Sequence, residues 1–592
     1  MNDLIYNELV ATPGYEIDFA AGTSYSMDAE AYLAIALSMA NLGEAGESET
    51  PDRLLEGIRR ANKRMALFIN RGGLQPPKRR NPLYAMLDKS VFEVADDSRG
   101  GNRLANFHPK IWIIKEHAVD NPSHRQIKLI VMSRNLTKDS SLDIAVAMTA
   151  PINPTVDEPI RRKHEPLKKM LLRLADYASR EKRKDIISLA NDIDHTGAFD
   201  LDSRYTDYDF LPFHFGENLN ADIDFETELP GRTMLVVSPF IDYSTLQWLN
   251  NYGAGAQKIL VTRLESLTPE IMDLYSGNER EVWVPTGIMA RNDVLPMNLH
   301  AKIYLSWGPR TGGTHLWLGS ANATGSGFHR NSEFLLRLTL RRGQNLFKDF
   351  VGEFTDKKKQ MFEEVSTLSD QPEVQPKDTS LSIAVRTSLI CRGNLTAEIS
   401  QSENGYRIHI SVRRLKGIDG TIRLAPIQEP HNEAVLTAEG CEIEVAEAAN
   451  LSEFFILSVT PFSETAEPVR MVVKLPVRGI PLDRDEQIFR SIINTRDKFL
   501  TYLQMLTTDL PTELMSLFNN QDADTPHASP RRAADVTPAI YESLLHKVAK
   551  NSDKLRDITE IAKMADKDVV PDSFINIASV LERLTKQLRR YE

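Results

Sequence analysis

Two copies of a His-x-Lys motif are the residues in this sequence whose types and spacing best suit chemistry. His108 and Lys110 form the first copy, and His300 and Lys302 form the second. Each copy stands at the start of an apolar run that is typical of a β-strand, in which side chains two residues apart point to the same face. The sequence therefore predicts an imidazole beside an ammonium group at two places.

Each motif is followed by a small polar cluster and then by an acid. One such arrangement has a bland explanation, because a partly exposed strand often shows polar residues on one face. Two copies in matching positions of the chain indicate catalysis instead. The shared residues are Ser133, Asn135 and Asp143 in the first copy, and Ser320, Asn322 and Glu333 in the second.

These residue types suit the cleavage of a phosphodiester. One imidazole can attack phosphorus and form a covalent phosphohistidine, which divides a difficult step into two. The other can protonate the leaving oxygen and then activate water, because its unperturbed pKa lies near neutrality. Ammonium and amide groups stabilise the charge on the phosphoryl oxygens, and an acid can fix each imidazole tautomer. None of these roles needs a metal or a cofactor, so neither is predicted.

The combined pattern resembles that of the phospholipase D superfamily over about residues 10–345. The segment GSANATGSGFHRNSEF is especially similar to the second signature of that family. The resemblance implies that both motifs meet at a pseudo-twofold seam, with His108 as the nucleophile and His300 as the general acid. It further implies phosphate binding by Lys110, Lys302, Asn135 and Asn322, support from Ser133 and Ser320, and orientation of the imidazoles by Asp143 and Glu333.

Two departures from the family pattern point to a particular branch. The family motif has an Asp five residues after the Lys, but Lys115 and Trp307 stand there. The first copy also lacks the Gly that precedes the Ser in the second copy. This Asp-less form is similar to the tyrosyl-DNA phosphodiesterase branch and to several nuclease-like members.

The elements that must position the motifs follow one order twice. Residues 1–155 alternate strand-like and helix-like patterns, and residues 231–365 repeat that order. Details also correspond, since Ser24 and Asp28 of SYSMD match Ser238 and Asp242 of SPFID. We interpret this as an internal duplication that gives an α/β fold. Its mixed-sheet core has two pseudo-symmetric halves, joined by helices and a loop over residues 156–230.

Two further regions follow the predicted core. A linker containing Pro and Ser spans residues 366–380, and the alternating β-branched segments of residues 380–481 predict a β-sandwich domain. Residues 482–592 are expected to be helical, with a linker near 519–536. In that region Thr537 and Pro538 predict a helix start, and an apolar face follows at Ile540, Leu544, Leu545 and Val548.

The composition indicates a soluble chain of several domains. Its 592 residues are too many for one core, and 41% hydrophobic with 26% charged residues is typical of globular proteins. No apolar run approaches the roughly 20 residues of a membrane span, and the N-terminus lacks the basic region of a secretory signal. The two cysteines, Cys391 and Cys441, exclude a disulfide scaffold and a Cys-rich zinc module. A cytoplasmic location is therefore expected.

Charge is unevenly distributed along the chain. The net charge is −11, yet residues 51–115 hold fourteen Lys and Arg against six acids. The run Lys78, Arg79 and Arg80 lies in this basic stretch. Such a run can be a solvated face, but beside a phosphodiesterase motif it favours a nucleic-acid-binding surface.

These observations predict a metal-independent nuclease that acts on nucleic acid, with DNA favoured over RNA. By analogy with bacterial nucleases of this superfamily, the expected setting is anti-phage defence or DNA repair, with a helicase or another defence-system protein as partner. The first alternative is a phospholipase or phosphatidyltransferase that acts on lipids. The second alternative is a non-catalytic nucleic-acid-binding module.

Overall fold

A computed structural model of the chain has a mixed α/β architecture, as the sequence predicts. Most of the linker predicted at 366–380, the linker near 519–536 and the helix predicted from Pro538 lie outside the described residues. The structure describes residues 8–40, 51–94, 105–137, 141–215, 233–251, 257–286, 288–290, 293–295, 298–308, 313–341, 346–355, 361–367, 387–388, 390–415, 420–462, 468–507, 553–572 and 574–576.

The first sheet has six strands in the order β5-β3-β1-β6-β7-β9. The strands β1, β3 and β5 are parallel, and β6, β7 and β9 add to them in antiparallel fashion. Helix α2 (Ala29–Met39) and helix α3 (Pro51–Arg64) cover one face. The strand bounds are β1 Tyr15–Ser24, β3 Met65–Asn70, β5 Val91–Val94, β6 Ile111–Ala118, β7 Arg125–Met132 and β9 Ala145–Pro151.

The second sheet has eight strands in the order β10-β19-β18-β17-β11-β12-β13-β20. Its inner strands β13-β12-β11-β17-β18-β19 repeat the order and the strand directions of the first sheet. The bounds are β10 Tyr205–Phe213, β11 Thr233–Val237, β12 Lys258–Val261, β13 Arg280–Pro285, β17 Ile303–Gly308, β18 Gly313–Gly319, β19 Glu333–Leu340 and β20 Phe362–Glu364.

One apolar core joins the two sheets. The strands β6 and β7 of the first sheet share it with β17 and β18 of the second, together with helix α4 (Glu158–Ala175) and helix α5 (Arg180–Asp194). These central strands are buried on both faces, which explains their continuous apolar runs. The segment interpreted as a connection, residues 156–230, contains α4 and α5 and also β10, which is an edge strand of the second sheet.

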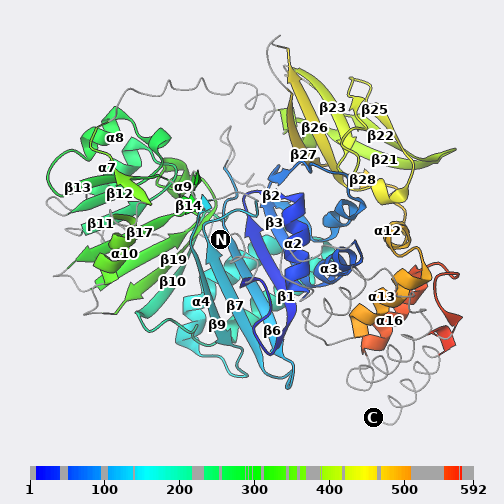
Figure 1. The fold of residues 1–592 in the computed structure, drawn as a ribbon, viewed down its shortest axis with the longest axis horizontal. Coiled ribbons are helices and arrows are strands. Elements are labelled where there is room, and N and C mark those ends of the chain that lie inside the picture. Colours follow the sequence, from blue (N-terminus) through cyan, green and yellow to red (C-terminus); the bar gives the residue numbers. More distant parts are fainter. Residues whose placement is uncertain are drawn as a thin grey trace.

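In its described residues, the chain after the second sheet packs against the helices that cover the first sheet. Its strands form two four-stranded sheets that enclose a separate core. These sheets and the helices that follow them share a larger core with α2 and α3, and Figure 1 shows them beside the first sheet. The bounds are β21 Leu395–Ser402, β22 Gly405–Val412, β23 Gly420–Pro426, β24 Ala434–Val435, β25 Cys441–Val445, β26 Phe454–Pro461, β27 Val469–Lys474, β28 Val477–Arg478, α12 Arg484–Ile492, α13 Arg496–Thr507 and α16 Asp553–Met564.

Candidate active site

The two His-x-Lys motifs lie just before their strands, at the junction of the two sheets. Strand β6 begins at Ile111 and β17 at Ile303, so each motif occupies the extended segment that leads into a strand. The first motif is fixed by the backbone of the second half, because the His108 N–H donates to the Ser332 carbonyl at 2.8 Å. The second motif is fixed by the first half, where the Leu142 carbonyl accepts from the His300 N–H at 3.0 Å.

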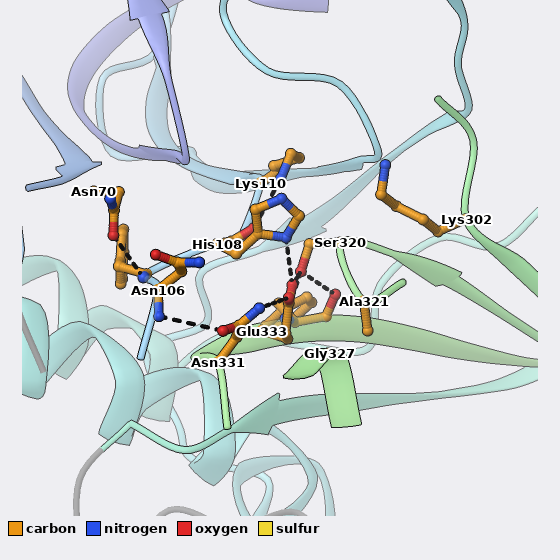
Figure 2. Close-up of polar contacts among 12 residues, drawn as sticks. Asn70, Asn106, His108, Lys110, Lys302, Ser320, Ala321, Gly327, Asn331 and Glu333 are labelled. Atoms are coloured by element: carbon orange, nitrogen blue, oxygen red, sulfur yellow. Dashed lines mark hydrogen bonds and ion pairs between the residues drawn. The ribbon is translucent and has the colours of Figure 1, made fainter. Parts of the chain in front are cut away.

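Each of these backbone contacts brings a histidine to an acid of the opposite half. His108 Nδ1 lies 2.8 Å from Glu333 Oε2, and this carboxylate is fully buried. The Ser320 hydroxyl donates to the same oxygen, and Asn331 Nδ2 donates to Oε1 at 3.3 Å. Figure 2 shows this network around the His108 ring. Both oxygens of the Glu333 carboxylate are therefore held in place.

The second histidine has the same arrangement with the halves exchanged. His300 Nδ1 lies 3.1 Å from Asp143 Oδ1. The Ser133 hydroxyl donates to Oδ1 at 3.0 Å, and the Ser141 hydroxyl donates to Oδ2 at 2.6 Å. The structure thus brings together the predicted histidines, acids and serines, and it pairs each histidine with the acid from the other half.

Sequence reasoning missed two residues of this network, Asn331 and Ser141. Each stands two positions before the acid whose outer oxygen it binds. A comparison of the two copies could have found them, because both positions carry a side chain that can donate a hydrogen bond.

Both imidazoles are poised with one ring nitrogen available for chemistry. A Nδ1–H that donates to a carboxylate leaves the Nε2 lone pair free, as a nucleophile or a base requires. Burial, aided by the charge of Lys110, lowers the pKa of His108 to about 4 although Glu333 opposes the shift. Burial and the charge of Lys302 likewise lower the pKa of His300 to about 4. Both rings are therefore neutral near pH 7 in the free protein.

The two lysines of the motifs form a buried cationic pair. Lys110 and Lys302 are each only 1% exposed. Each ammonium donates to the backbone carbonyl of the histidine in its own motif. Lys110 Nζ lies 3.0 Å from the His108 carbonyl oxygen. Burial and the neighbouring charge of Lys302 hold the pKa of Lys110 well below its usual value. Figure 2 shows Lys302 facing the space beside His108 and Lys110. This pair is suited to an anionic ligand.

The carboxylates stay ionised in spite of their burial. Burial alone would raise the pKa of Glu333, but the charges of His108 and Lys110 and the hydrogen bonds outweigh it, so the pKa is lowered. Burial also acts to raise the pKa of Asp143, but its hydrogen bonds to His300 and Ser141 and the charges of His300 and Lys302 together outweigh burial, so this pKa is lowered too. Each imidazole therefore faces a negative charge that stabilises an imidazolium when one forms.

The two predicted phosphate-binding amides share an unusual feature. In the described part of the chain, the Oδ1 atoms of Asn135 and Asn322 are buried without a hydrogen-bond partner. Unsatisfied buried polar atoms are costly and rare, and a carbonyl oxygen can only accept, so a donor such as water must satisfy these two atoms. Only the Nδ2 groups of the two amides can donate to a phosphate oxygen.

Two serines hold the loops that carry these amides. Ser24 Oγ accepts from the Leu136 N–H at 3.2 Å, and Ser238 Oγ accepts from the Ala323 N–H at 3.0 Å. These are the serines that the comparison of SYSMD with SPFID aligns. Asp242, the counterpart of Asp28, binds the Gly325 N–H of the second loop.

The remaining predicted positions lie outside this network. Lys78, Arg79 and Arg80 are exposed in the loop after β4 (Leu74–Gln75), and Arg80 forms an ion pair with Glu429, between β23 and β24, at 3.2 Å. Lys115, at a position where the family motif has Asp, forms an ion pair with Asp192 of helix α5 at 2.6 Å. That departure is therefore a structural contact between a strand and a helix.

Comparisons with known proteins found similarity only among solved structures. No family model and no curated protein matches the chain. Yeast tyrosyl-DNA phosphodiesterase is similar at 11% identity and a TM-score of 0.37, over 57% of this chain and 86% of that one. Phosphatidylserine synthase from Haemophilus influenzae Rd KW20 is similar at 12% identity and a TM-score of 0.35, over 66% and 91%. NucT from Helicobacter pylori is similar at 14% identity and a TM-score of 0.20, over 25% and 97%. At such scores these similarities carry no argument about activity.

Proposed function

We propose that the chain is a phosphodiesterase of the phospholipase D type, built on a duplicated core, that cleaves nucleic acid without a metal. The observation that carries this proposal is the reciprocal pairing of His108 with Glu333 and of His300 with Asp143. The buried ammonium groups of Lys110 and Lys302 accompany the pairs. Together they provide a nucleophile, an acid and positive charge around one phosphoryl group.

The reaction proceeds in two displacements at phosphorus. His108 Nε2 attacks the phosphorus, the bond to the leaving oxygen breaks, and His300 gives its proton to that oxygen. His300 then takes a proton from water, the water oxygen attacks, and the bond between phosphorus and His108 breaks. The free pKa of His300 is about 4, and the negative charge of a bound phosphodiester raises it, so substrate binding and protonation are coupled.

Nucleic acid is the substrate that the charge distribution supports best. The basic run Lys78, Arg79 and Arg80 is exposed on the half that supplies the nucleophile. No described helix is long and apolar enough to cross a membrane. DNA as the target, a defence or repair setting and a helicase-like partner are carried by the family analogy alone. Lipid phosphodiesters are the second candidate substrate.

A direct assay tests the proposal. Purified full-length protein is incubated in EDTA with single- and double-stranded oligonucleotides and, separately, with phospholipid vesicles. We expect cleavage of an oligonucleotide in EDTA that is lost in His108→Ala. Turnover of phospholipid but not of oligonucleotide would establish the lipid alternative. Binding of oligonucleotide without cleavage would establish the non-catalytic one.

A further inference from the structure

Phe240 is a half-exposed aromatic residue on the loop that holds the second half of the site. Its side chain is 49% exposed. Its backbone is held by Ser238, whose hydroxyl donates to the Phe240 carbonyl at 2.7 Å. Ser238 Oγ also accepts from the N–H of Ala323, the residue after Asn322. An exposed ring on a rigid backbone next to a phosphate-binding amide is well placed to contact a substrate.

The back of this ring is covered by a guanidinium that also contacts the motif of His300. Arg263 Cζ lies 4.8 Å from the centre of the Phe240 ring. Its Nε and an Nη donate to the carbonyl of Leu299, at 2.9 and 2.7 Å. Leu299 is the residue before His300. Phe240 is therefore joined to the active site on two sides, through Ser238 and through Arg263.

The register of the strands gives Arg263 a counterpart in the first half. In the first half, Ser24 pairs with Ile69, and Asn70 is the next residue. In the second half, Val237 pairs with Val261, so Ser238 lies beside Thr262, and Arg263 is the next residue. Asn70 and Arg263 therefore occupy equivalent positions. Asn70 Oδ1 accepts from the N–H of Phe107, the residue before His108, at 2.8 Å. The position therefore supports the motif histidine in both halves, and only the second half has an arginine there.

The first half has a residue at the position equivalent to Phe240, but that residue is neither aromatic nor exposed. Ser26 occupies the matching place, because its carbonyl accepts from Ser24 Oγ at 2.7 Å. Ser26 is only 8% exposed and presents no ring. The first half instead has Tyr25 edge-on to His108, with ring centres 5.1 Å apart. The stacked pair of Phe240 and Arg263 is thus an addition of the second half that the shared fold does not require.

We propose that Phe240, backed by Arg263, stacks on the nucleobase next to the scissile phosphate on the His300 side of the site. An aromatic face backed by arginine is the feature with which proteins bind unpaired bases, and such stacking is tolerant of sequence. A base can reach the ring only when it is free of its partner strand, so the substrate is unpaired at this nucleotide. This inference rests on the proposed nuclease function and deepens it.

The test uses an oligonucleotide in which a single phosphodiester is cleavable and all other linkages are methylphosphonates. One version has a base on both sides of the scissile phosphate, and two others are abasic on one side. We expect Phe240→Ala to lower kcat/KM on the complete substrate by roughly 5- to 100-fold. On the substrate that is abasic on the His300 side, the same change should have less than about a twofold effect, because no base is there to stack.

Two further variants control the experiment. Phe240→Trp keeps an aromatic face and should restore kcat/KM on the complete substrate. Phe462→Ala removes another exposed ring, 72% exposed at the end of β26, and should change nothing.

Several outcomes would overturn the inference. Equal losses on all substrates would make Phe240 a structural residue, and no loss would make it a solvated one. Weaker binding of anionic vesicles with unchanged oligonucleotide cleavage would make it a lipid contact. Wild-type protein that cleaves no oligonucleotide would refute the nuclease proposal and this inference together, whereas an active wild type with an indifferent Phe240→Ala variant refutes this inference alone.

Discussion

In the first half of the core, helices α2 and α3 share one apolar core with the C-terminal sheets and with helices α12, α13 and α16. In the second half, α7 (Tyr243–Asn251) and α8 (Pro269–Leu274) belong to a core whose described residues all lie between 211 and 365. Ion pairs reinforce the first arrangement, since Arg484 of α12 binds Asp88 at 2.6 Å. The C-terminal region therefore attaches to one of two similar units.

The two halves differ in what packs against them, but they contribute the same kinds of residue to the candidate site. Each half supplies one histidine, one lysine, one amide and the acid for the other half's histidine. Chemistry on a phosphodiester needs two different roles, a nucleophile and a proton donor. The carboxylate partners of the two histidines do not distinguish these roles. The two imidazoles differ in that Lys302 Nζ also lies 3.4 Å from His300 Nδ1.

Replacement of the histidines should give the largest effect and separate the roles. His108→Ala removes the nucleophile and should lower turnover by about 10⁴-fold or more, whereas His300→Ala removes acid–base assistance worth about 10²- to 10⁴-fold. With a p-nitrophenyl leaving group, which needs no proton, His300→Ala should recover activity and accumulate phosphohistidine at His108. Mass spectrometry detects the adduct. An adduct on His300 in the His108→Ala variant would exchange the roles.

Replacement of the acids that bind the histidine of the opposite half should give the next largest loss of turnover. Glu333→Gln and Asp143→Asn keep the shape but remove the charge that fixes the tautomer and stabilises the imidazolium. Loss of such a carboxylate costs about 10³- to 10⁴-fold in turnover. Because the pairs are crossed, Glu333→Gln combined with His108→Ala should add little to His108→Ala alone, and the same holds for Asp143 with His300. Additive losses within a crossed pair would contradict the pairing.

Acid should destabilise the fold through both histidines. Their pKa values are lowered to about 4, whereas an unfolded His titrates near 6.5. Between these values the unfolded chain binds protons that the folded chain does not. The free energy of unfolding should therefore fall as the pH drops from about 6.5 to about 4, and this contribution is fully present at higher pH. Denaturant titrations measure it, with His300→Gln expected to show a weaker pH dependence than the wild type.

The sequence could suggest which side chains lie at the candidate site, because these residues stand near strand ends in two similar copies. Both histidines, both lysines and both amides are visible as a repeated local pattern. No local pattern reveals that each acid binds the histidine of the opposite half. His108 and Glu333 are 225 positions apart, and their contact depends on a backbone hydrogen bond from His108 to Ser332. Docking of the C-terminal region on the first half also depends on surfaces, such as Arg484 against Asp88, that no local pattern reveals.

The donors to the outer carboxylate oxygens should have a moderate effect. Asn331→Ala and Ser141→Ala each remove one hydrogen bond from an acid. Glu333 keeps its bonds to His108 and Ser320, and Asp143 keeps its bonds to His300 and Ser133. Residues of this kind are typically worth about 10- to 100-fold where they orient a catalytic group. We expect similar losses of kcat in both variants, with KM nearly unchanged. A loss in one variant only would show that the two acids do not contribute equally.

The basic loop should give the smallest effect on the chemistry and the clearest one on binding. Lys78, Arg79 and Arg80 are all exposed, and Arg80 also forms an ion pair with Glu429, which follows β23. If these residues contact phosphates, each contact releases counterions, and log affinity falls with log salt by about 0.7 to 0.9 per phosphate.

Replacing all three basic residues with Ala should therefore weaken oligonucleotide binding and flatten the salt dependence by roughly two units, since Arg80 is already paired. Fluorescence anisotropy over a salt series measures this slope. Glu429→Gln, which releases Arg80 from its ion pair, should instead steepen it. An unchanged slope in the triple variant would make the loop a solvated face. Because the loop belongs to the first half, a flattened slope would place the electrostatic part of substrate binding on the half that carries His108 and the C-terminal region.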